Sequence, residues 1–410
     1  MLIKFLLLSL TRVYSTGVGF LLILLSAEIL GLDIRGKIAI AVTWMTAFFT
    51  FLHLSIGQLG YKIVIDDKNK TSEVISYFII YDLIITLSLA ISLPVIFNFF
   101  IPTSKISLLE LYFSLLLVPV MMLEQQLLTL FLAFNDTNVL NKVSIINRTL
   151  NLIFTSLLLF AFPNYFTFIA CLFLLSASMA YSYFSKIKNE FSYQFIKFNF
   201  IKLVKNGINF HFFNAFGYIG YTLLPLLILP LYVANNEFAL YEIGFKLISL
   251  VMIVATSCQL LAMRVFSKEI NIKSGWNQYL KIVLIYFIIS YIIVLLYSLI
   301  YSYIINISYF SKYFISLTTL YELIPYIPLI GTTAFLPTLF VNLNLLNLSA
   351  LYNFILGAFC FSLLFILSNL YSVDGVFIAL KIVYTLSGLL FLAVMFFIYY
   401  KKIKASPDVN

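Results

Sequence analysis

Polar and ionisable residues recur at helical spacing inside segments of this sequence that are otherwise apolar. The clearest series is Asn141, Ser144, Arg148, Asn151 and Thr155, whose members are three or four positions apart. Such spacing places all five on one face of an α-helix. A guanidinium beside several hydrogen-bonding groups can bind an anion or a ligand rich in hydroxyls. Two interpretations are open: a hydrogen-bonded seam between helices, or the wall of a water-filled cavity.

Further ionisable residues lie within long apolar runs. They are Arg12, Glu28, Asp82, Glu124, Arg148, His211, Glu242, Lys246 and Lys381. A charged group at membrane depth costs about 2.5–3.5 kcal/mol to insert and usually faces a cavity or a partner. Those near a segment end can instead reach the headgroups, and Glu242 can pair with Lys246 four positions on. The remaining excess of cations predicts an interior that attracts an anion, such as a diphosphate or an acidic sugar.

The elements that position these residues are predicted to be transmembrane helices. Of the 410 residues, 63% are hydrophobic and only 10% are charged, whereas soluble domains carry about 25% charged residues. Apolar runs of about twenty residues match the length that a helix needs to cross the hydrocarbon. Twelve helices are predicted, at residues 8–30, 38–61, 74–100, 108–134, 139–162, 164–186, 207–233, 239–266, 279–305, 322–346, 348–370 and 374–400. The sequence therefore predicts an all-α integral membrane protein.

A basic connection divides the predicted helices into two halves. Residues 188–206 mix lysines with aromatic side chains, which suits either a helix at the headgroup surface or an ordinary basic linker. The layout is then a six-helix bundle at 1–187, the linker, a second six-helix bundle at 207–400, and a tail at 401–410. Two such halves are typical of transporters whose substrate path runs between structural repeats.

The distribution of lysine and arginine predicts the orientation of the chain. With the N-terminus inside, seventeen of these residues fall on the cytoplasmic side. Four fall on the other side: Arg35, Lys37, Lys105 and Lys312. Because cytoplasmic loops carry the excess of positive charge, we expect both termini to be cytoplasmic.

Motifs for soluble-type catalysis or for metal binding do not occur in this sequence. Cys171, Cys258 and Cys360 lack the spacing of metal ligands, and His53 and His211 are too few for a metal cluster. No phosphate loop or nucleophile elbow is present. We therefore expect neither an enzyme nor a cofactor, and no nucleic-acid partner.

Three passages carry a resemblance to a known family: EILGLDIRGK within residues 28–60, ALYEIGFKL within residues 239–269, and VDGVFIALK within residues 373–391. Their order and organisation resemble the Wzx-type polysaccharide flippases of the multidrug/oligosaccharidyl-lipid/polysaccharide (MOP) exporter superfamily. The resemblance implies a MATE-like fold and location in the bacterial inner membrane. It also implies a function in O-antigen or capsule biosynthesis: undecaprenyl-diphosphate-linked oligosaccharides would be moved across the membrane by alternating access, coupled to an ion gradient.

The resemblance also suggests roles for individual residues. A cationic lumen would place Arg12, Arg148, Lys246 and Lys381 near the anionic substrate. Asn141, Asn151, Asn214 and Tyr218 would hydrogen-bond sugar hydroxyls, and Asp82 or Glu124 would carry a coupling proton or sodium ion. Besides the lipid-linked oligosaccharide and membrane lipids, a polysaccharide polymerase and a chain-length regulator are candidate partners.

Two alternative functions remain open at the level of sequence. A cation-coupled drug or metabolite antiporter of the same superfamily would share the fold and use Asp82, Glu110 and Glu124 to hold cations. A membrane-embedded polysaccharide polymerase or ligase is a second alternative. It is disfavoured because such enzymes need a large external loop, and no external loop predicted here exceeds about twenty residues.

Overall fold

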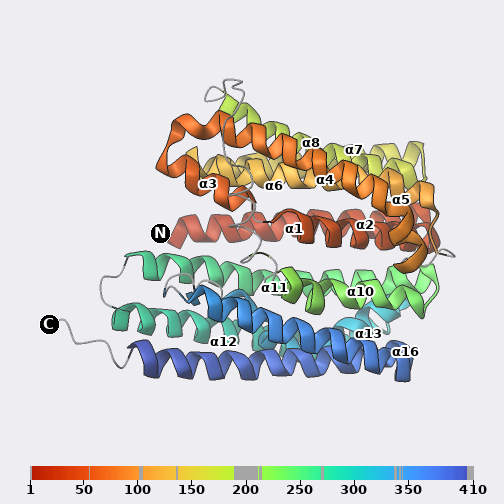
Figure 1. The fold of residues 1–410 in the computed structure, drawn as a ribbon. Helices are drawn as coiled ribbons and strands as arrows, with labels where there is room; N and C mark the ends of the chain where they lie inside the picture. Colours follow the sequence, from red (N-terminus) through yellow and green to blue (C-terminus); the bar gives the residue numbers. More distant parts are fainter. Residues whose placement is uncertain are drawn as a thin grey trace. The chain divides into compact units, whose positions relative to one another are not determined.

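The structure is a computed structural model that describes residues 2–54, 56–100, 105–134, 137–188, 211, 215–268, 272–336, 339–340, 343 and 345–403. Every regular element in these residues is a helix (Figure 1). The chain forms two compact units. Unit 1 comprises Met1–Ala215 and Leu229–Ala239, and unit 2 comprises Phe216–Ile228 and Leu240–Asn410. The predicted linker at 188–206 lies almost wholly outside the described residues.

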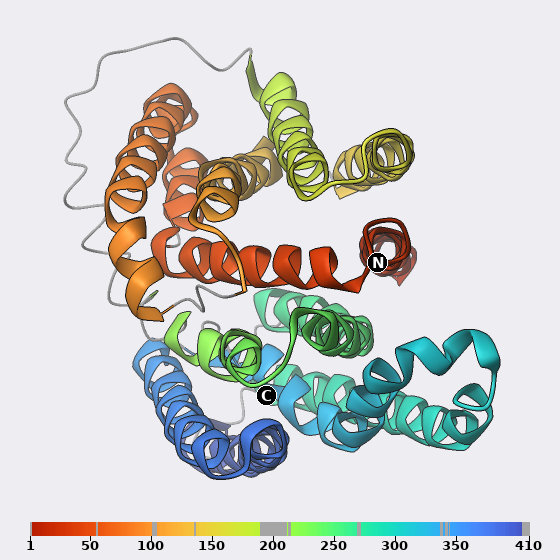
Figure 2. The ribbon, with the colours of Figure 1, turned by 90° about the vertical axis from the view of Figure 1, so that its right-hand side faces the viewer.

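Unit 1 is a bundle of long apolar helices. Its first eight α-helices and one short 3₁₀ turn are α1 (Leu2–Leu30), α2 (Leu32–Leu52), α3 (Ile56–Asp66), η1 (Lys68–Lys70), α4 (Thr71–Phe100), α5 (Leu108–Leu115), α6 (Leu117–Phe134), α7 (Thr137–Ala161) and α8 (Tyr165–Ile187). α6 packs against α3, α4 and α8, and α7 packs against both α1 and α8. Figure 2 shows α7 and α8 side by side, joined by a short turn.

The second half of the chain combines long helices with several short, irregular segments. They are η3 (Ile219–Leu223), α10 (Leu224–Ile228), η4 (Leu229–Leu231), α11 (Asn235–Lys268), α12 (Ile272–Ile304), η5 (Ser308–Tyr313), α13 (Phe314–Leu323), η6 (Ile324–Tyr326), α14 (Ile327–Ile330), η7 (Gly331–Ala334), α16 (Leu346–Ile398) and η8 (Tyr399–Ile403). Within unit 2, α16 packs against η3, α10, α13 and α14. The segment η4 and the start of α11 belong to unit 1.

α16 is a helical hairpin. Its backbone turns at Ser372, which has φ 52° and ψ −124°, so the two predicted helices 348–370 and 374–400 are its two legs. A β-carbon on Gly375 would overlap the carbonyl oxygen of Leu367, so only glycine fits at this tight turn. The Tyr352 hydroxyl lies 3.5 Å from the carbonyl oxygen of Ser387, which holds the legs together.

The predicted tenth helix is wrong in both position and continuity. Residues 322–334 belong instead to a series of short segments, α13, η6, α14 and η7, that starts earlier, at Phe314, and runs to Ala334. Pro325 and Pro328 each lie in the first turn of one of these segments. Proline has no N–H to donate but fits the first helical turn. The prolines therefore mark segment starts inside the span, and the sequence interpretation treated this region as the beginning of a continuous helix.

The predicted second helix is also divided. α2 ends at Leu52 and α3 begins at Ile56, with Leu54 in the left-handed region at φ 44°. Backbone that leaves the helix at membrane depth needs other hydrogen-bond partners. Here the Tyr81 hydroxyl donates to the carbonyl oxygen of Leu52, and Nε2 of His211 lies 2.8 Å from the carbonyl oxygen of Thr50.

The surface of the helices suits a membrane. Ten helical stretches in the described residues are long and apolar enough to cross one. Counting the legs of α16 separately and adding the shorter segment Ala215–Leu231 accounts for all twelve predicted helices. Large apolar side chains also point outward, as Leu87 and Ile91 do on α4. Water would oppose this exposure and acyl chains would not, so the prediction of a multi-pass membrane protein is confirmed.

Candidate functional site

The polar series on α7 lies on the buried side of its helix. Asn141, Asn151 and Thr155 are buried, whereas the opposite side of α7 exposes Ile146, Leu150, Phe154 and Leu157 among others. This arrangement follows from the spacing, because residues three and four apart share one helical face. The polar face therefore points into unit 1, toward α1, α6 and α8.

Part of the polar face is a seam between helices. The Ser144 hydroxyl lies 3.0 Å from the Ser15 hydroxyl of α1, and Nδ2 of Asn151 donates to the carbonyl oxygen of Cys171 on α8 at 3.2 Å. Nδ2 of Asn147 also donates to the Ser182 hydroxyl of α8 at 3.1 Å. These bonds fix α7 against its two neighbours, as the seam interpretation expects.

The seam leaves other polar atoms without partners. Nε of Arg148, Oδ1 of Asn141 and Oδ1 of Asn151 are buried and have no hydrogen-bond partner in the described structure. A buried polar atom without a partner costs about 1–3 kcal/mol, and most buried polar atoms are paired. Water or a bound ligand would supply the missing bonds, so the cavity interpretation accounts for what the seam leaves over.

Arg148 lies near an acidic side chain inside unit 1. The Glu124 carboxylate on α6 interacts electrostatically with Arg148 and contacts the Ser176 hydroxyl on α8. Tyr183 on α8 lies within electrostatic range of both charges. We call Glu124, Arg148, Ser176 and Tyr183 the Arg148 cluster. Three helices contribute to it, so its geometry depends on the packing of α6, α7 and α8.

Asp82 forms a separate buried site between α4 and α6. Its Oδ1 accepts a hydrogen bond of 2.9 Å from Nε2 of Gln126. Both residues are at most 5% exposed. Oδ2 of Asp82 and Oε1 of Gln126 have no hydrogen-bond partner in the described structure. Two free buried acceptors side by side can hold a proton or a small cation.

A pair of histidines occupies the break between α2 and α3. The rings of His53 and His211 meet edge to face with centroids 4.3 Å apart. Nδ1 of His53 lies 3.0 Å from the carbonyl oxygen of Phe49, while His211 reaches Thr50. Both rings thus reach backbone carbonyl groups in the last turn of α2. This site stabilises the backbone, which the sequence interpretation of His211 as part of a polar stripe did not foresee.

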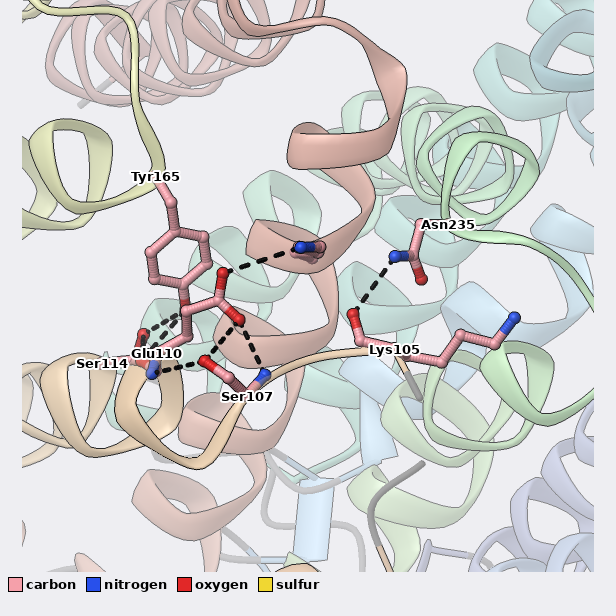
Figure 3. Close-up of polar contacts among 7 residues, drawn as sticks. Lys105, Ser107, Glu110, Ser114, Tyr165 and Asn235 are labelled. Atoms are coloured by element: carbon pink, nitrogen blue, oxygen red, sulfur yellow. Dashed lines mark hydrogen bonds and ion pairs between the residues drawn. The ribbon is translucent and has the colours of Figure 1, made fainter. Parts of the chain in front are cut away.

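Glu110 is the centre of a closed polar network at the start of α5 (Figure 3). Its carboxylate accepts hydrogen bonds from the backbone N–H and the hydroxyl of Ser107, at 2.7 and 2.8 Å, and lies 3.9 Å from Nζ of Lys37. The Ser114 and Tyr165 hydroxyls complete the network and lie 2.7 Å from each other. Glu110, which the antiporter alternative uses to hold a cation, is thus engaged as a helix cap.

The adjacent segment of unit 1 is fixed by backbone contacts. Nζ of Lys105 donates to the carbonyl oxygen of Val233 at 2.9 Å. Nδ2 of Asn235 donates to the carbonyl oxygen of Lys105 at 3.1 Å (Figure 3). A β-carbon on Gly36 would overlap the carbonyl oxygen of Asn235. Lys105 therefore ties the segment Leu229–Ala239 to the residues before α5, and Gly36 lets the segment pack closely against the start of α2.

The remaining predicted site residues are dispersed. Arg12 is half-buried on α1, and Lys246 is half-buried on α11, one turn from the buried Glu242. Tyr218 is 41% exposed, and Asn214 lies outside the described residues. Nζ of Lys381 on α16 forms an ion pair of 2.9 Å with Glu322 on α13, so its charge is balanced within unit 2. The structure thus brings together Arg148, Glu124, Asn141 and Asn151.

Several partners at these sites were missed by sequence reasoning. Gln126, Ser176 and Tyr183 are ordinary polar residues of apolar helices, and only packing reveals what they contact. Glu322 was missed because it was assigned to the first position of the misplaced tenth helix. Its place in the last turn of α13 could have been found from the prolines that follow it.

No family model and no curated protein matches the sequence. Solved structures of MATE transporters are similar over nearly the whole chain. An inward-facing multidrug resistance MATE transporter of the MOP superfamily has a TM-score of 0.70 at 12% identity, with 97% of this chain and 96% of that chain covered. The MATE multidrug transporter DinF-BH, solved as a complex, has a TM-score of 0.70 at 13% identity, covering 97% and 95%.

A eukaryotic relative in fold, the MATE transporter AtDTX14, has a TM-score of 0.67 at 12% identity, covering 96% of this chain and 95% of that chain. At these identities the likeness concerns the fold. The prediction of a MATE-like fold with about twelve membrane helices is confirmed. This chain has the fold of the MATE transporters of the MOP exporter superfamily.

Proposed function

We propose that this protein is a flippase that moves an anionic, lipid-linked oligosaccharide across the bacterial inner membrane. The supporting observation is the polar face of α7, with one unpaired guanidinium nitrogen and two unpaired amide oxygens. A diphosphate or acidic sugar offers acceptors to Arg148, and sugar hydroxyls offer donors to Asn141 and Asn151. A lipophilic cation offers neither an anionic group nor several hydroxyls.

The spacing of the polar face also suits an extended ligand. Asn141 and Asn151 are ten positions apart, which on an α-helix is about 15 Å. Arg148 lies between them, so an anionic group there would leave a hydroxyl-rich chain within reach of both amides. In this proposal the ligand is an undecaprenyl-diphosphate-linked repeat unit for O-antigen or capsule. The termini are cytoplasmic, and a polymerase and a chain-length regulator act downstream.

The Asp82–Gln126 pair is the candidate coupling site. Its two free acceptor oxygens are buried in the same unit as the polar face of α7. Binding a proton or a cation there would remove a buried charge, which changes the packing energy of α4 against α6. Alternating access needs such a difference between states. Glu124 is less suited to this role because it lies within electrostatic range of Arg148, whose positive charge favours the ionised carboxylate.

A second candidate function is a cation-coupled drug antiporter of the same superfamily. The Asp82–Gln126 pair favours it as well, since an unbalanced buried carboxylate can hold an organic cation. The multidrug transporter DinF-BH shares the fold. The ion pair Lys381–Glu322 and the proximity of Glu124 to Arg148 lower the excess of positive charge that supports the flippase.

Complementation separates the two functions. In a bacterial strain that lacks its polysaccharide flippase and carries the matching biosynthetic genes, expression of this chain should restore surface polysaccharide, and Arg148→Ala should abolish restoration. Lys312→Gln is the matched control, because Lys312 is an exposed cation with no place in the polar face. Efflux of the cationic dye ethidium without polysaccharide restoration would favour the antiporter and contradict the proposal.

A further inference from the structure

An apolar groove opens between α4, α6 and α8 of unit 1. It encloses about 350 Å³. α4 contributes Ile75 and Ile79 to its lining, α8 contributes Ala177, Ala180, Tyr181 and Phe184, and apolar side chains of α6 complete it. The two alanines of α8 create the space, because they face larger side chains on α4 and α6. Apart from the Tyr181 hydroxyl, this lining offers a ligand no polar group, so it suits an apolar occupant such as a hydrocarbon chain.

The groove lies within one leaflet of the membrane. At 1.5 Å per residue, Phe184 and Ala177 are about 5 Å and about 15 Å from the end of α8 at Ile187, and Ile75 and Ile79 are about 6 Å and about 12 Å from the start of α4. Half of the hydrocarbon core is about 15 Å thick. The groove therefore spans the depth of the acyl chains of one leaflet.

Lysines surround the same end of the unit. The ring of Phe131, near the end of α6, contacts the ring of Tyr183, near the end of α8, at 5.3 Å. Nζ of Lys68 lies 5.6 Å from the ring centroid of Phe134, the last residue of α6. The start of α4 and the ends of α6 and α8 are thus level. This end carries the lysine rim, which we define as Lys68, Lys70, Lys186 and Lys188, all exposed.

We propose that the groove binds one acyl chain of an anionic membrane phospholipid, whose phosphate lies on the lysine rim. The apolar lining of the groove, its position in one leaflet and the adjacent positive charge all match such a lipid. Lys70 pairs with Asp67 at 3.8 Å and Lys68 lies over the ring of Phe134, which leaves Lys186 and Lys188 as the main headgroup contacts. A basic rim near the membrane surface selects anionic lipids over zwitterionic ones. The proposal does not depend on which substrate the protein transports.

Fluorescence quenching by brominated lipids tests the proposal on the full chain. The reporter variant carries Tyr181→Trp on a background in which both natural tryptophans are removed, Trp44→Phe and Trp276→Phe. It is reconstituted in phosphatidylcholine vesicles with increasing amounts of brominated phosphatidylglycerol, or of brominated phosphatidylcholine in a phosphatidylglycerol-free membrane. We expect the anionic lipid to quench at a mole fraction at least fivefold lower. Equal quenching by the two lipids would overturn the proposal.

Two variants separate the headgroup from the chain. One lysine contributes about a fivefold preference for anionic lipid, so Lys186→Gln with Lys188→Gln should lower the preference at least fivefold. Lys281→Gln with Lys401→Gln removes the same charge from unit 2 and should leave it unchanged. Ala177→Phe should fill the groove and weaken quenching by both lipids, whereas Ala170→Leu, on the same helix outside the groove, should not. A preference that survives the Lys186 and Lys188 changes contradicts the proposed headgroup site.

Competition identifies the occupant. Soluble glycerol phosphate should have no effect, since the acyl chain provides the apolar contacts, and its competition would mean that the rim alone is the site. Unlabelled phosphatidylglycerol should displace the brominated lipid in proportion to its mole fraction. If polyprenyl phosphate displaced it at a tenfold lower mole fraction, the groove would belong to the lipid carrier of a substrate and the phospholipid proposal would be wrong.

Discussion

The two units differ in the kind of buried polar atom that lacks a hydrogen-bond partner. In unit 1, the buried side-chain atoms without a hydrogen-bond partner include carboxylate, amide and guanidinium atoms, from Asp82, Gln126, Asn141, Arg148 and Asn151. In the described part of unit 2, the corresponding atoms of Ser257 and Ser349 are hydroxyls. A hydroxyl can rotate toward a neighbour, whereas a fixed amide or carboxylate oxygen cannot. Unit 1 thus has the unused binding capacity.

In unit 2, several tyrosine hydroxyls instead donate to backbone carbonyl groups close by. The Tyr286 hydroxyl donates to the carbonyl oxygen of Pro328 at 3.0 Å, and that of Tyr297 donates to the carbonyl oxygen of Leu317 at 2.9 Å. These bonds hold the segments that proline and glycine interrupt. Lys381 pairs with Glu322. The difference between the units shows that a charged residue within an apolar helix does not indicate function until its partners are known.

The largest effect is expected for Gly375 in the hairpin of unit 2, and it concerns stability. Gly375→Ala places a methyl group where the backbone carbonyl of Leu367 already lies, so the hairpin must deform. We expect a loss of about 3 kcal/mol in stability, as for other severe overpacking, seen as a lower midpoint of thermal unfolding in detergent. Gly17→Ala is the control: its β-carbon meets no atom within 4 Å, and a fall equal to that of Gly375→Ala would contradict the explanation.

The second prediction tests whether the polar face of α7 in unit 1 binds the substrate. Arg148→Ala removes a charged hydrogen-bond donor whose contribution is about 1.5–3 kcal/mol, or about 10- to 100-fold in substrate affinity. Arg148→Lys keeps the charge and should recover part of the loss. The measurement is transport in reconstituted vesicles at equal protein content. Transport by Arg148→Ala at the normal rate would assign the polar face of α7 to packing alone.

The third prediction concerns the second buried site of unit 1. Asp82→Asn keeps the shape and an acceptor for Gln126 but removes the ionisable group. We expect flux driven by a proton or sodium gradient to fall about tenfold or more, as for loss of a buried carrier of charge, while thermal stability stays equal or rises because a buried carboxylate is gone. Gradient-driven flux at the normal rate would exclude Asp82 from coupling. Asp374→Asn, at the exposed apex of the hairpin, is the control.

The smallest effect is expected for the ion pair of unit 2. Its side chains are 31% and 40% exposed, so a double-mutant cycle of Lys381→Gln and Glu322→Gln should give a coupling of about 1 kcal/mol or less. Transport should change little in the double variant. If Lys381→Gln alone abolished transport and the double variant did not recover, Lys381 would be a substrate contact and the contrast between the units would weaken.

Much of the fold could be predicted from the sequence because lipid imposes a simple rule on apolar length. Twelve helices and the buried orientation of the α7 series follow from hydropathy and spacing alone. The breaks could not be predicted: Leu54 interrupts a helix without proline or glycine at that position, and the interruption depends on Tyr81 and His211. Partners such as Gln126 for Asp82 depend on how α4 packs against α6, which one chain without relatives does not reveal.

The tight turn of α16 has a consequence for how the protein is made. Because Gly375 nearly touches Leu367 across the turn, the tip of the hairpin reaches its final packing only when both legs are present. The first leg alone cannot complete the turn, so assembly of this part of the chain has to follow synthesis of the second leg.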